Sequence, residues 1–192
     1  MRPAHRRAFK YFYCEVSDIK KAASIFLRAE INPQDVKALI RWMGNPQVTR
    51  YLHEEADVVQ TLRRVQATVP APMLTFQFNQ WGRFFMVCVP DGSAIGFVKL
   101  KALSSSPGAY EIVYVIGEEA LWGNGYGEAA IRTALSTAFF DWRARQVLAR
   151  VYAGNTRSIR AVRACGFSCE HRDERLFRYR ITMSDYLEHV QA

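Results

Sequence analysis

The first third of the chain contains one short apolar run and two stretches of apolar residues at helical spacing. Residues 24–30 are β-branched and apolar enough to predict a first strand. Asn32 is a good N-cap with Pro33 at the first helical position, and Gly44 ends the first helical pattern. Asn45-Pro46 predicts a turn before the second helix. The apolar positions of the two predicted helices are Val36, Leu39, Ile40 and Met43, then Val58, Val59, Leu62 and Val65, ahead of Pro70 and Pro72.

The middle of the chain has the short runs and turn residues of antiparallel strands. A strand is predicted at residues 73–78 or at residues 83–89, followed by a Pro90-Asp91-Gly92 turn. Residues 94–103 and 110–116 predict two more strands, joined by a Ser/Pro/Gly loop at 104–108. That loop is short enough for a hairpin, so these strands are expected to pair with one another.

After Tyr126 the apolar positions return to a period of about 3.6 residues, which predicts a helix. The positions concerned are Ile131, Leu135, Ala138, Phe139 and Trp142. Residues 146–152 then predict a strand, 158–165 a helix and 176–183 a last strand.

The predicted elements run in the order strand, two helices, three strands, helix, strand, helix, strand. We therefore expect a mixed α/β (α+β) fold, with one sheet and helices on both faces. A helix separates the strands at 110–116 and 146–152, so this connection is expected to be a crossover. Residues 1–22 carry basic and aromatic side chains without a clear period, and we interpret them as an N-terminal extension of a domain at 23–192.

Composition favours a single folded domain, and we expect it in the cytoplasm. The chain has 192 residues, 49% hydrophobic and 23% charged, which is ordinary globular usage. Charged residues interrupt every apolar run before the ~18 residues that a membrane helix needs, and residues 1–10 are basic without the apolar segment of a secretory signal. The four cysteines, Cys14, Cys88, Cys165 and Cys169, lack the spacing of a zinc site, so no metal is expected.

The charge of the chain favours an anionic partner. The formal net charge is +8 and the pI is about 9.5. Nucleic acid, an anionic membrane surface and a phosphorylated cofactor such as CoA all fit this sign, and charge alone does not choose among them. A solvated basic face with no specific ligand is an equally good interpretation.

The segment that carries most chemical information joins the strand at 110–116 to the helix after Tyr126. Its glycines are Gly117, Gly123, Gly125 and Gly127. Glycine permits positive φ and close backbone approach, and a helix N-terminus offers free N–H groups, so the geometry suits a pyrophosphate. The Rossmann fingerprint and the P-loop are excluded, because neither G-x-G-x-x-G at the first strand nor Gly-Lys-Ser/Thr occurs.

With these residues the sequence resembles the GNAT N-acetyltransferases, whose cofactor loop reads Arg/Gln-x-x-Gly-x-Gly/Ala after the fourth strand. Trp122 stands where Arg or Gln is usual, and a Trp-Gly-x-Gly-Tyr loop is typical of the branch that includes ribosomal-protein N-terminal acetyltransferases. Asn155, Ser158, Val162, Gly166 and Phe167 match the family's Asn-x-x-Ser/Ala helix and following Gly-Phe. A looser likeness lies at 39–52. The resemblance covers residues 24–183.

The resemblance implies a mostly antiparallel sheet of six to seven strands with a splayed parallel pair, about four helices, and acetyl-CoA as cosubstrate. The pantetheine arm would pair with backbone at Val115, Ile116 and Gly117. The cofactor loop, Trp122, Gly123, Asn124, Gly125, Tyr126 and Gly127, would hold the pyrophosphate. Asn155 and Ser158 would face the pantetheine and thioester. Arg157, Arg160, Arg163 or Arg132 could reach the outer phosphate, or could be solvated.

The implied reaction is direct attack of a neutral amine on the acetyl thioester. Glu111 is the candidate base. Many family members carry a Tyr at the position of Val162 as the acid for the leaving thiolate, so that role has either moved or been dropped here. Ser158 is the best substitute by position, with Tyr126 and Cys165 behind it. One extra residue separates Glu111 from Trp122 compared with the common spacing, and a shift of one register would turn the side chain at this site to the other face of the strand.

The acceptor stays open at this stage. A peptide N-terminal α-amine is the first expectation and a small-molecule amine, including an aminoglycoside, the second; His53-Glu54-Glu55 lies where the acceptor-binding segment would begin. The competing class is a binding module: a catalytically silent CoA sensor, or a basic protein that binds nucleic acid through residues 1–22, which is possible but not favoured. A homodimer is possible if residues 179–186 add a strand across an interface.

Overall fold

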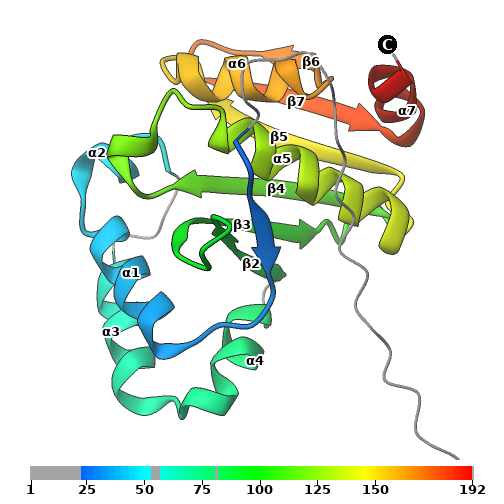
Figure 1. The fold of residues 1–192 in the computed structure, drawn as a ribbon. Helices are drawn as coiled ribbons and strands as arrows, with labels where there is room; N and C mark the ends of the chain where they lie inside the picture. The colour runs from blue at the N-terminus through cyan, green and yellow to red at the C-terminus, as the bar shows by residue number, and fades with distance from the viewer. Residues whose placement is uncertain (1–22, 53–56, 81, 192) are drawn as a thin grey trace, which may run out of the picture.

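One seven-stranded sheet organises the protein in this computed structural model, which describes residues 23–52, 57–80 and 82–191 (Figure 1). The strand order is β1-β2-β3-β4-β5-β7-β6, and each pair is antiparallel except β4 and β5, which are parallel. The strands are β1 (Phe26–Arg28), β2 (Arg83–Cys88), β3 (Ala94–Ala102), β4 (Ala109–Ile116), β5 (Gln146–Tyr152), β6 (Ser168–Arg172) and β7 (Leu176–Thr182). This confirms the mixed sheet and the parallel pair that the sequence predicts.

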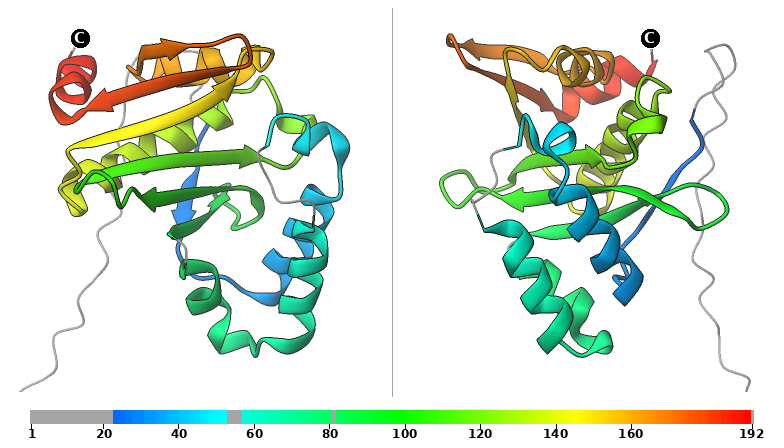
Figure 2. Two further views of the ribbon diagram at one scale, coloured as in Figure 1. Left: turned by 180° about the vertical axis from the view of Figure 1, so that it is seen from behind. Right: turned by 90° about the vertical axis from the view of Figure 1, so that its left-hand side faces the viewer.

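Helices lie on both faces of the sheet (Figure 2). On one side are α1 (Pro33–Met43), α2 (Pro46–Thr49), α3 (Val58–Thr68) and α4 (Leu74–Asn79); on the other are α5 (Tyr126–Ser136), α6 (Thr156–Ala164) and α7 (Met183–Gln191). Among the described residues, none of these helices combines the length and the apolar character needed to cross a membrane.

Each face of the sheet has its own apolar core, and β4 contributes to both. Ile112 packs with Ile131, Leu135 and Phe139 on the α5 side. Val115 packs with Trp42 and other side chains of the α1 side. Because successive side chains of a strand point to opposite faces, the residues of β4 alternate between the two cores.

The start of α1 is fixed as its sequence predicts. Asn32 and Asp35 form a capping box, in which each side chain accepts a hydrogen bond from the other's backbone N–H. Asp35 is only 3% exposed and is held by Arg28 through two hydrogen bonds of 2.7 and 2.9 Å. The hydrogen bond to Asp35 raises the pKa of Arg28 above its ordinary value, so the guanidinium stays charged. It ties α1 to the edge strand β1.

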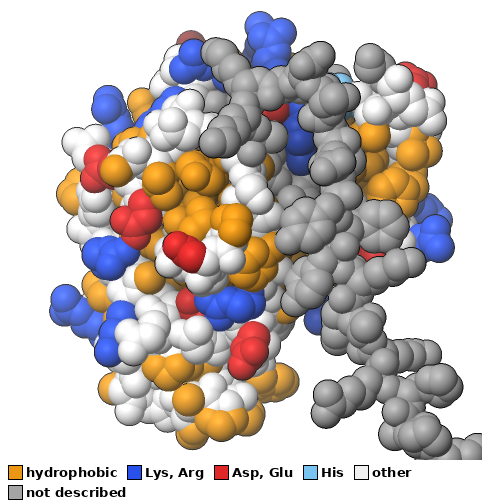
Figure 3. Space-filling view, in the orientation of Figure 1, with side chains coloured by type: hydrophobic (Ala, Val, Ile, Leu, Met, Phe, Trp, Pro, Cys, Tyr) orange, Lys and Arg blue, Asp and Glu red, His pale blue; other side chains and the backbone are white. Residues whose placement is uncertain are grey.

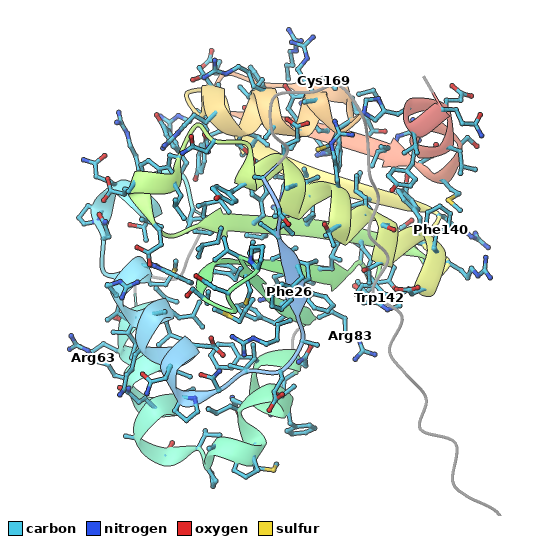
Figure 4. The ribbon with its side chains drawn as sticks, in the orientation of Figure 1. Phe26, Arg63, Arg83, Phe140, Trp142 and Cys169 are labelled. Atoms are coloured by element: carbon cyan, nitrogen blue, oxygen red, sulfur yellow. The ribbon has the colours of Figure 1, made fainter. Side chains whose placement is uncertain are left out.

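The end of α5 departs from a regular helix and packs back onto the sheet. Residues Thr137–Asp141 form a π-helical turn, after which Trp142 stacks on Phe85 of β2 with ring centroids 6.0 Å apart. Arg83 lies over the same indole, 5.9 Å from its centroid (Figure 4). The aromatic contact anchors the turn that follows α5 to β2, next to the edge strand β1.

Several sequence expectations need correction. Residues 73–78 are wrong as a strand: Pro72 lies in a 3₁₀ turn that leads into α4, and the strand is the alternative at 83–89. Asn45-Pro46 is more than a turn, because Asn45 caps the short helix α2. The described residues hold seven α-helices rather than about four, since α2, α4 and α7 were not predicted. Strand β6 was also not predicted.

Two further expectations concern interaction surfaces. The segment 179–186 is the end of β7 followed by the start of α7, and β7 already pairs with β5 and β6, so it has no free edge to offer a partner. The face in Figure 3 shows Lys and Arg side chains scattered among Asp and Glu rather than gathered in one patch. The N-terminal extension at 1–22, with its proposed nucleic-acid role, and His53-Glu54-Glu55 lie outside the described residues.

The segment that leaves β4 is locked to α1 through one buried tryptophan. Trp42 is 1% exposed and donates its indole N–H to Glu118, 2.9 Å away, and Arg41 pairs with the same carboxylate. Gly117 lies directly against the indole, where a side chain would have no room. The path of the chain toward the glycine-rich loop therefore depends on Trp42.

Gly117→Ala should destabilise the protein. Its Cβ would lie 2.2 Å from Cγ and Cδ2 of Trp42, so the indole or the end of β4 must move. We expect the free energy of unfolding, measured by chemical denaturation, to fall by about 2 kcal/mol. Gly92→Ala is the matched control: Gly92 has φ +90° and space among the described residues around a Cβ, so only about 1 kcal/mol of backbone strain is expected. If the free energy of unfolding falls equally in the two variants, the indole of Trp42 can move away from the new methyl group without destabilising the protein.

Candidate active site

The parallel strands β4 and β5 pair for three residues and then part. Their register runs from Ala109–Gln146 to Glu111–Leu148. Beyond Glu111, β4 remains paired with β3 as far as Ile116, while β5 remains paired with β7 as far as Tyr152. The two strands diverge toward their C-terminal ends (Figure 2). A slot therefore opens in the plane of the sheet.

The slot is a pocket of about 130 Å³. Its lining comes from β4, β5, the start of α6 and the segment after α2: Tyr51, Leu52, Glu111, Ile112, Val113, Tyr114, Ala149, Arg150, Val151, Tyr152, Asn155 and Ser158. Three of the residues predicted for the site, Glu111, Asn155 and Ser158, are thus brought together although 47 positions separate the outermost two in the sequence.

The backbone of β4 presents alternate residues to the slot. The carbonyl of Ala109 accepts a hydrogen bond from the N–H of Leu103, and the N–H of Gly117 donates to the carbonyl of Ile95 at 2.9 Å. The backbone N–H and C=O groups of the odd-numbered residues are therefore directed toward β3. Alternation then turns the backbone groups of Ile112, Tyr114 and Ile116 toward the slot. Of the three predicted pantetheine partners, Ile116 faces the slot, whereas Val115 and Gly117 face β3.

The glycine-rich loop forms an open turn at the N-terminus of α5. Gly123 and Gly125 have φ of +82° and +83°, and Gly125 is the N-cap. A Cβ on either residue would meet nothing within 4 Å among the described residues, so their surface is open to a ligand. The first N–H groups of a helix lack partners within the helix, and the loop therefore offers donors to an anion. Asn124 is exposed at its tip, and Tyr126 begins the helix.

Gly127 serves a different purpose. Its Cβ would lie 3.1 Å from Cε2 of Tyr114, so the ring of Tyr114 packs against the first turn of α5. The third glycine of the motif is thus needed for packing against β4 rather than for an open surface.

Trp122 and Arg157 form a stacked pair beside the loop. The indole N–H of Trp122 donates to the carbonyl of Ile116 at 2.7 Å. The guanidinium of Arg157, from the first turn of α6, lies 3.8 Å from the centroid of the same indole. By contrast, Arg132 bonds to Glu128 and to the carbonyl of Ala164. Arg157, unlike Arg132, is therefore positioned at the loop.

Asn155 and Ser158 shape the start of α6. Asn155 is the N-cap and its Oδ1 accepts a hydrogen bond from the N–H of Ser158 at 3.1 Å. The Tyr114 hydroxyl donates to Oγ of Ser158 at 2.9 Å. Burial raises the pKa of Tyr114 to about 12, so this phenol remains protonated at neutral pH. Tyr126 and Cys165, the other two candidates for the leaving-group role, pack into the core on the α5 side.

Glu111 lies on the opposite face of the sheet from Tyr114. Its carboxylate accepts two hydrogen bonds from Arg150 of β5, with Nε–Oε1 of 2.5 Å and Nη2–Oε2 of 3.0 Å, and its side chain is 13% exposed. Tyr51 and Tyr152 border the same side, with ring centroids 6.3 Å apart. Glu111 and Ser158 thus approach one slot from its two sides.

Tyr114 and Arg150 were not among the residues predicted from the sequence. Tyr114 alternates with Ile112 and Ile116 on the inward side of β4, so its hydroxyl needs a partner in an apolar setting. That signal was readable, but its partner on α6 was not. No group of three or more His, Cys, Asp or Glu side chains within 23–52, 57–80 and 82–191 could hold a metal ion.

Comparison with solved structures shows the same fold in several acetyltransferases. Spermidine N-acetyltransferase from Vibrio cholerae, in complex with CoA and spermine, has a TM-score of 0.70 and 20% identity over 85% of this chain and 98% of that one. Aminoglycoside acetyltransferase AAC(6')-Ib, in complex with coenzyme A, has a TM-score of 0.70 and 17% identity over 88% of this chain and 100% of that one. At these identities the likeness shows the fold alone.

Sequence comparison identifies the family. An N-acetyltransferase named p20 from Bacillus licheniformis, itself described as uncharacterized, is 24% identical over 139 residues, 71% of this chain and 75% of that protein. The model of the family described as Acetyltransferase (GNAT) domain matches residues 25–168, well over half of the chain. That match spans the sheet from β1 to the start of β6 and includes both motifs of the slot. The chain belongs to the GNAT acetyltransferase family.

Proposed function

We propose that this protein is an N-acetyltransferase that moves an acetyl group from acetyl-CoA to a primary amine by direct attack. The observation that carries the proposal is the parting of β4 from β5 beside an open, glycine-rich helix N-terminus. An arm with amide groups fits the slot, because the backbone of β4 has donors and acceptors directed into it. A pyrophosphate fits the N–H groups of Gly123 to Gly127.

Arg157 completes the anion site in this proposal. The family pattern has Arg or Gln where Trp122 stands, so the loop itself lacks that side chain. Arg157 brings a cation to the same place from α6, and the indole of Trp122 holds it at 3.8 Å. Trp122 is also bonded to Ile116 of β4, so β4, the loop and α6 are joined at one point.

The two sides of the slot have different tasks. Glu111, on the side of Tyr51 and Tyr152, accepts the proton that the amine loses as it attacks the carbonyl carbon. Arg150 holds both carboxylate oxygens and keeps Glu111 directed along the slot. On the other side, the hydroxyl of Ser158 stabilises the thiolate as the C–S bond breaks.

The first choice of acceptor is a peptide N-terminal α-amine. The Trp-Gly-Asn-Gly-Tyr loop at 122–126 supports it, because that loop is typical of the branch that contains ribosomal-protein N-terminal acetyltransferases. The contacts of Trp122 with Ile116 and Arg157 give the tryptophan a structural role in the site. A small-molecule amine is the second choice, supported by the similarity of the fold to spermidine and aminoglycoside acetyltransferases.

Calorimetric titration of acetyl-CoA tests the cofactor loop. We expect wild type to bind and Gly125→Glu to lose at least ~10-fold in affinity, because the new carboxylate occupies the anion site. Gly92→Glu is the matched control: Gly92 also has positive φ and open space, but lies in the β2–β3 turn away from the slot. Wild-type protein that binds no acetyl-CoA would overturn the proposed function.

Arg157→Leu tests the stacked pair. Losing one charge-assisted hydrogen bond to phosphate should weaken acetyl-CoA binding by about 10-fold. Arg160→Leu, an exposed arginine of the same helix, should change the dissociation constant less than about twofold. Titration of dephospho-CoA shows which phosphate is involved: a loss that persists with dephospho-CoA assigns Arg157 to the pyrophosphate. Equal affinities of the two variants would remove Arg157 from the site.

Glu111→Gln tests the base. Steady-state rates would first be measured with a panel of amines comprising short peptides, spermidine and an aminoglycoside. For the best acceptor, kcat of Glu111→Gln should fall ~100-fold while acetyl-CoA binding stays unchanged. Glu170→Gln is the matched control, since Glu170 is also a strand carboxylate paired with an arginine, Arg180, but lies on β6. A Glu111→Gln enzyme with wild-type kcat would show that another group accepts the proton.

A further inference from the structure

Helix α6 brings one hydroxyl group to the slot. Val162 of this helix has no hydroxyl and is fully buried in the core on the α5 side. Ser158 lies one helical turn earlier and lines the slot. In the proposed reaction, the hydrogen bond to the leaving thiolate therefore comes from Ser158, and the O–H of this serine must be oriented toward the sulfur.

Tyr114 reaches that serine from the opposite wall. It comes from β4, its hydroxyl donates to Oγ of Ser158 at 2.9 Å, and both residues line the slot. Its ring rests on Gly127, where a Cβ would approach to 3.1 Å, so the aromatic ring is fixed between α5 and α6. Neither residue can turn away without losing a contact that the fold provides.

We propose that Tyr114 is a positioning residue for thioester cleavage: by donating to Oγ of Ser158, it leaves the Ser158 O–H free to point at the sulfur of the bound acetyl donor. The proposal rests on the proposed function and deepens it. A hydroxyl has one proton to donate and can accept two hydrogen bonds. Once Tyr114 occupies an acceptor position, the serine proton is directed elsewhere, and hydrogen bonds in a chain strengthen one another.

The balance of the step is simple. The amine lone pair forms the C–N bond, the C–S bond breaks and its electron pair stays on sulfur. The amine proton goes to Glu111 and from there to water. Ser158 gives the sulfur a hydrogen bond rather than its proton, and the thiolate takes a proton from water as CoA leaves. Tyr114 and Ser158 are unchanged at the end.

The surroundings of Tyr114 suit a permanent donor. Burial raises its pKa to about 12; the hydrogen bond with Ser158 and the charge of Arg157 act in the opposite direction, and Cys165 acts with burial. Burial also raises the pKa of Cys165 to about 12, so that neighbour stays neutral. The Tyr114 hydroxyl therefore keeps its proton throughout the neutral range.

A double-mutant cycle tests the proposal. Steady-state rates of wild type, Tyr114→Phe, Ser158→Ala and the double variant would be measured with acetyl-CoA and the best amine. We expect kcat to fall ~10-fold in Tyr114→Phe and ~100-fold in Ser158→Ala, with KM for acetyl-CoA changed less than about twofold. The double variant should match Ser158→Ala, because Tyr114 acts only through Ser158. Tyr179→Phe, which removes another buried phenol, should keep the wild-type kcat.

The outcomes distinguish a failure of the proposed function from a failure of the proposed role of Tyr114. Wild type that acetylates no amine overturns the proposed function, and this inference with it. Active wild type with an unaffected Tyr114→Phe, or with losses that multiply in the double variant, overturns the inference alone. Melting temperatures check folding. If Tyr114→Phe does not fold, Ser158→Thr, which keeps the hydroxyl, must retain kcat where Ser158→Ala loses it; equal rates of these two variants overturn the proposal.

Discussion

The parting of β4 from β5 after Glu111 is the constraint on which the rest of the structure depends. Each strand is fully paired along its other edge, β4 with β3 and β5 with β7, so the two halves of the sheet can follow their own twist. The backbone groups of Tyr114 and the N–H of Ile116 then face a gap instead of a strand, whereas the carbonyl of Ile116 accepts the indole N–H of Trp122. Such groups are costly to bury unpaired, and a ligand with amide groups is the natural partner.

Both helical layers are arranged to hold this gap in shape. On one side, Trp42 of α1 locks the chain just after β4 through Gly117 and Glu118. On the other, α5 and α6 begin at the mouth of the slot, so that two helix N-termini lie beside it. Because β4 contributes side chains to both cores, neither layer can shift without disturbing the other.

Sequence analysis predicted correctly those helices and strands whose own residues carry a clear local signal. Helix α1 has a cap, a proline and a clean apolar period, and β5 was predicted with the bounds that the structure shows. Strand β6 was missed because Ser168–Arg172 is mostly exposed and carries no apolar alternation. Residues 73–78 alternate apolar and polar side chains as a strand does, but Pro72 lies in a 3₁₀ turn that leads directly into α4.

The site residues also fall into two groups, those predicted from local motifs and those that depend on contacts between distant segments. The glycine-rich loop and Asn155–Ser158 belong to local motifs, whereas Arg150 and Tyr114 act through partners 39 and 44 residues away, across a parallel crossover. No local pattern encodes the register of such a pair, because it is set by how β4 and β5 meet. Sequence reasoning therefore reached the residues of each motif but not the contacts between them.

Two departures from the family pattern share one physical explanation. Trp122 stands where the family resemblance leads us to expect Arg or Gln, and Val162 where it leads us to expect a tyrosine; in our proposals Arg157 of α6 serves the loop, and Tyr114 of β4 serves α6. What the chemistry needs is a cation beside the phosphates and a hydroxyl beside the sulfur, and either can come from any element that borders the slot. Since β4, the loop and α6 converge at Trp122, Arg157, Tyr114 and Ser158, a group that one element does not supply is within reach of another.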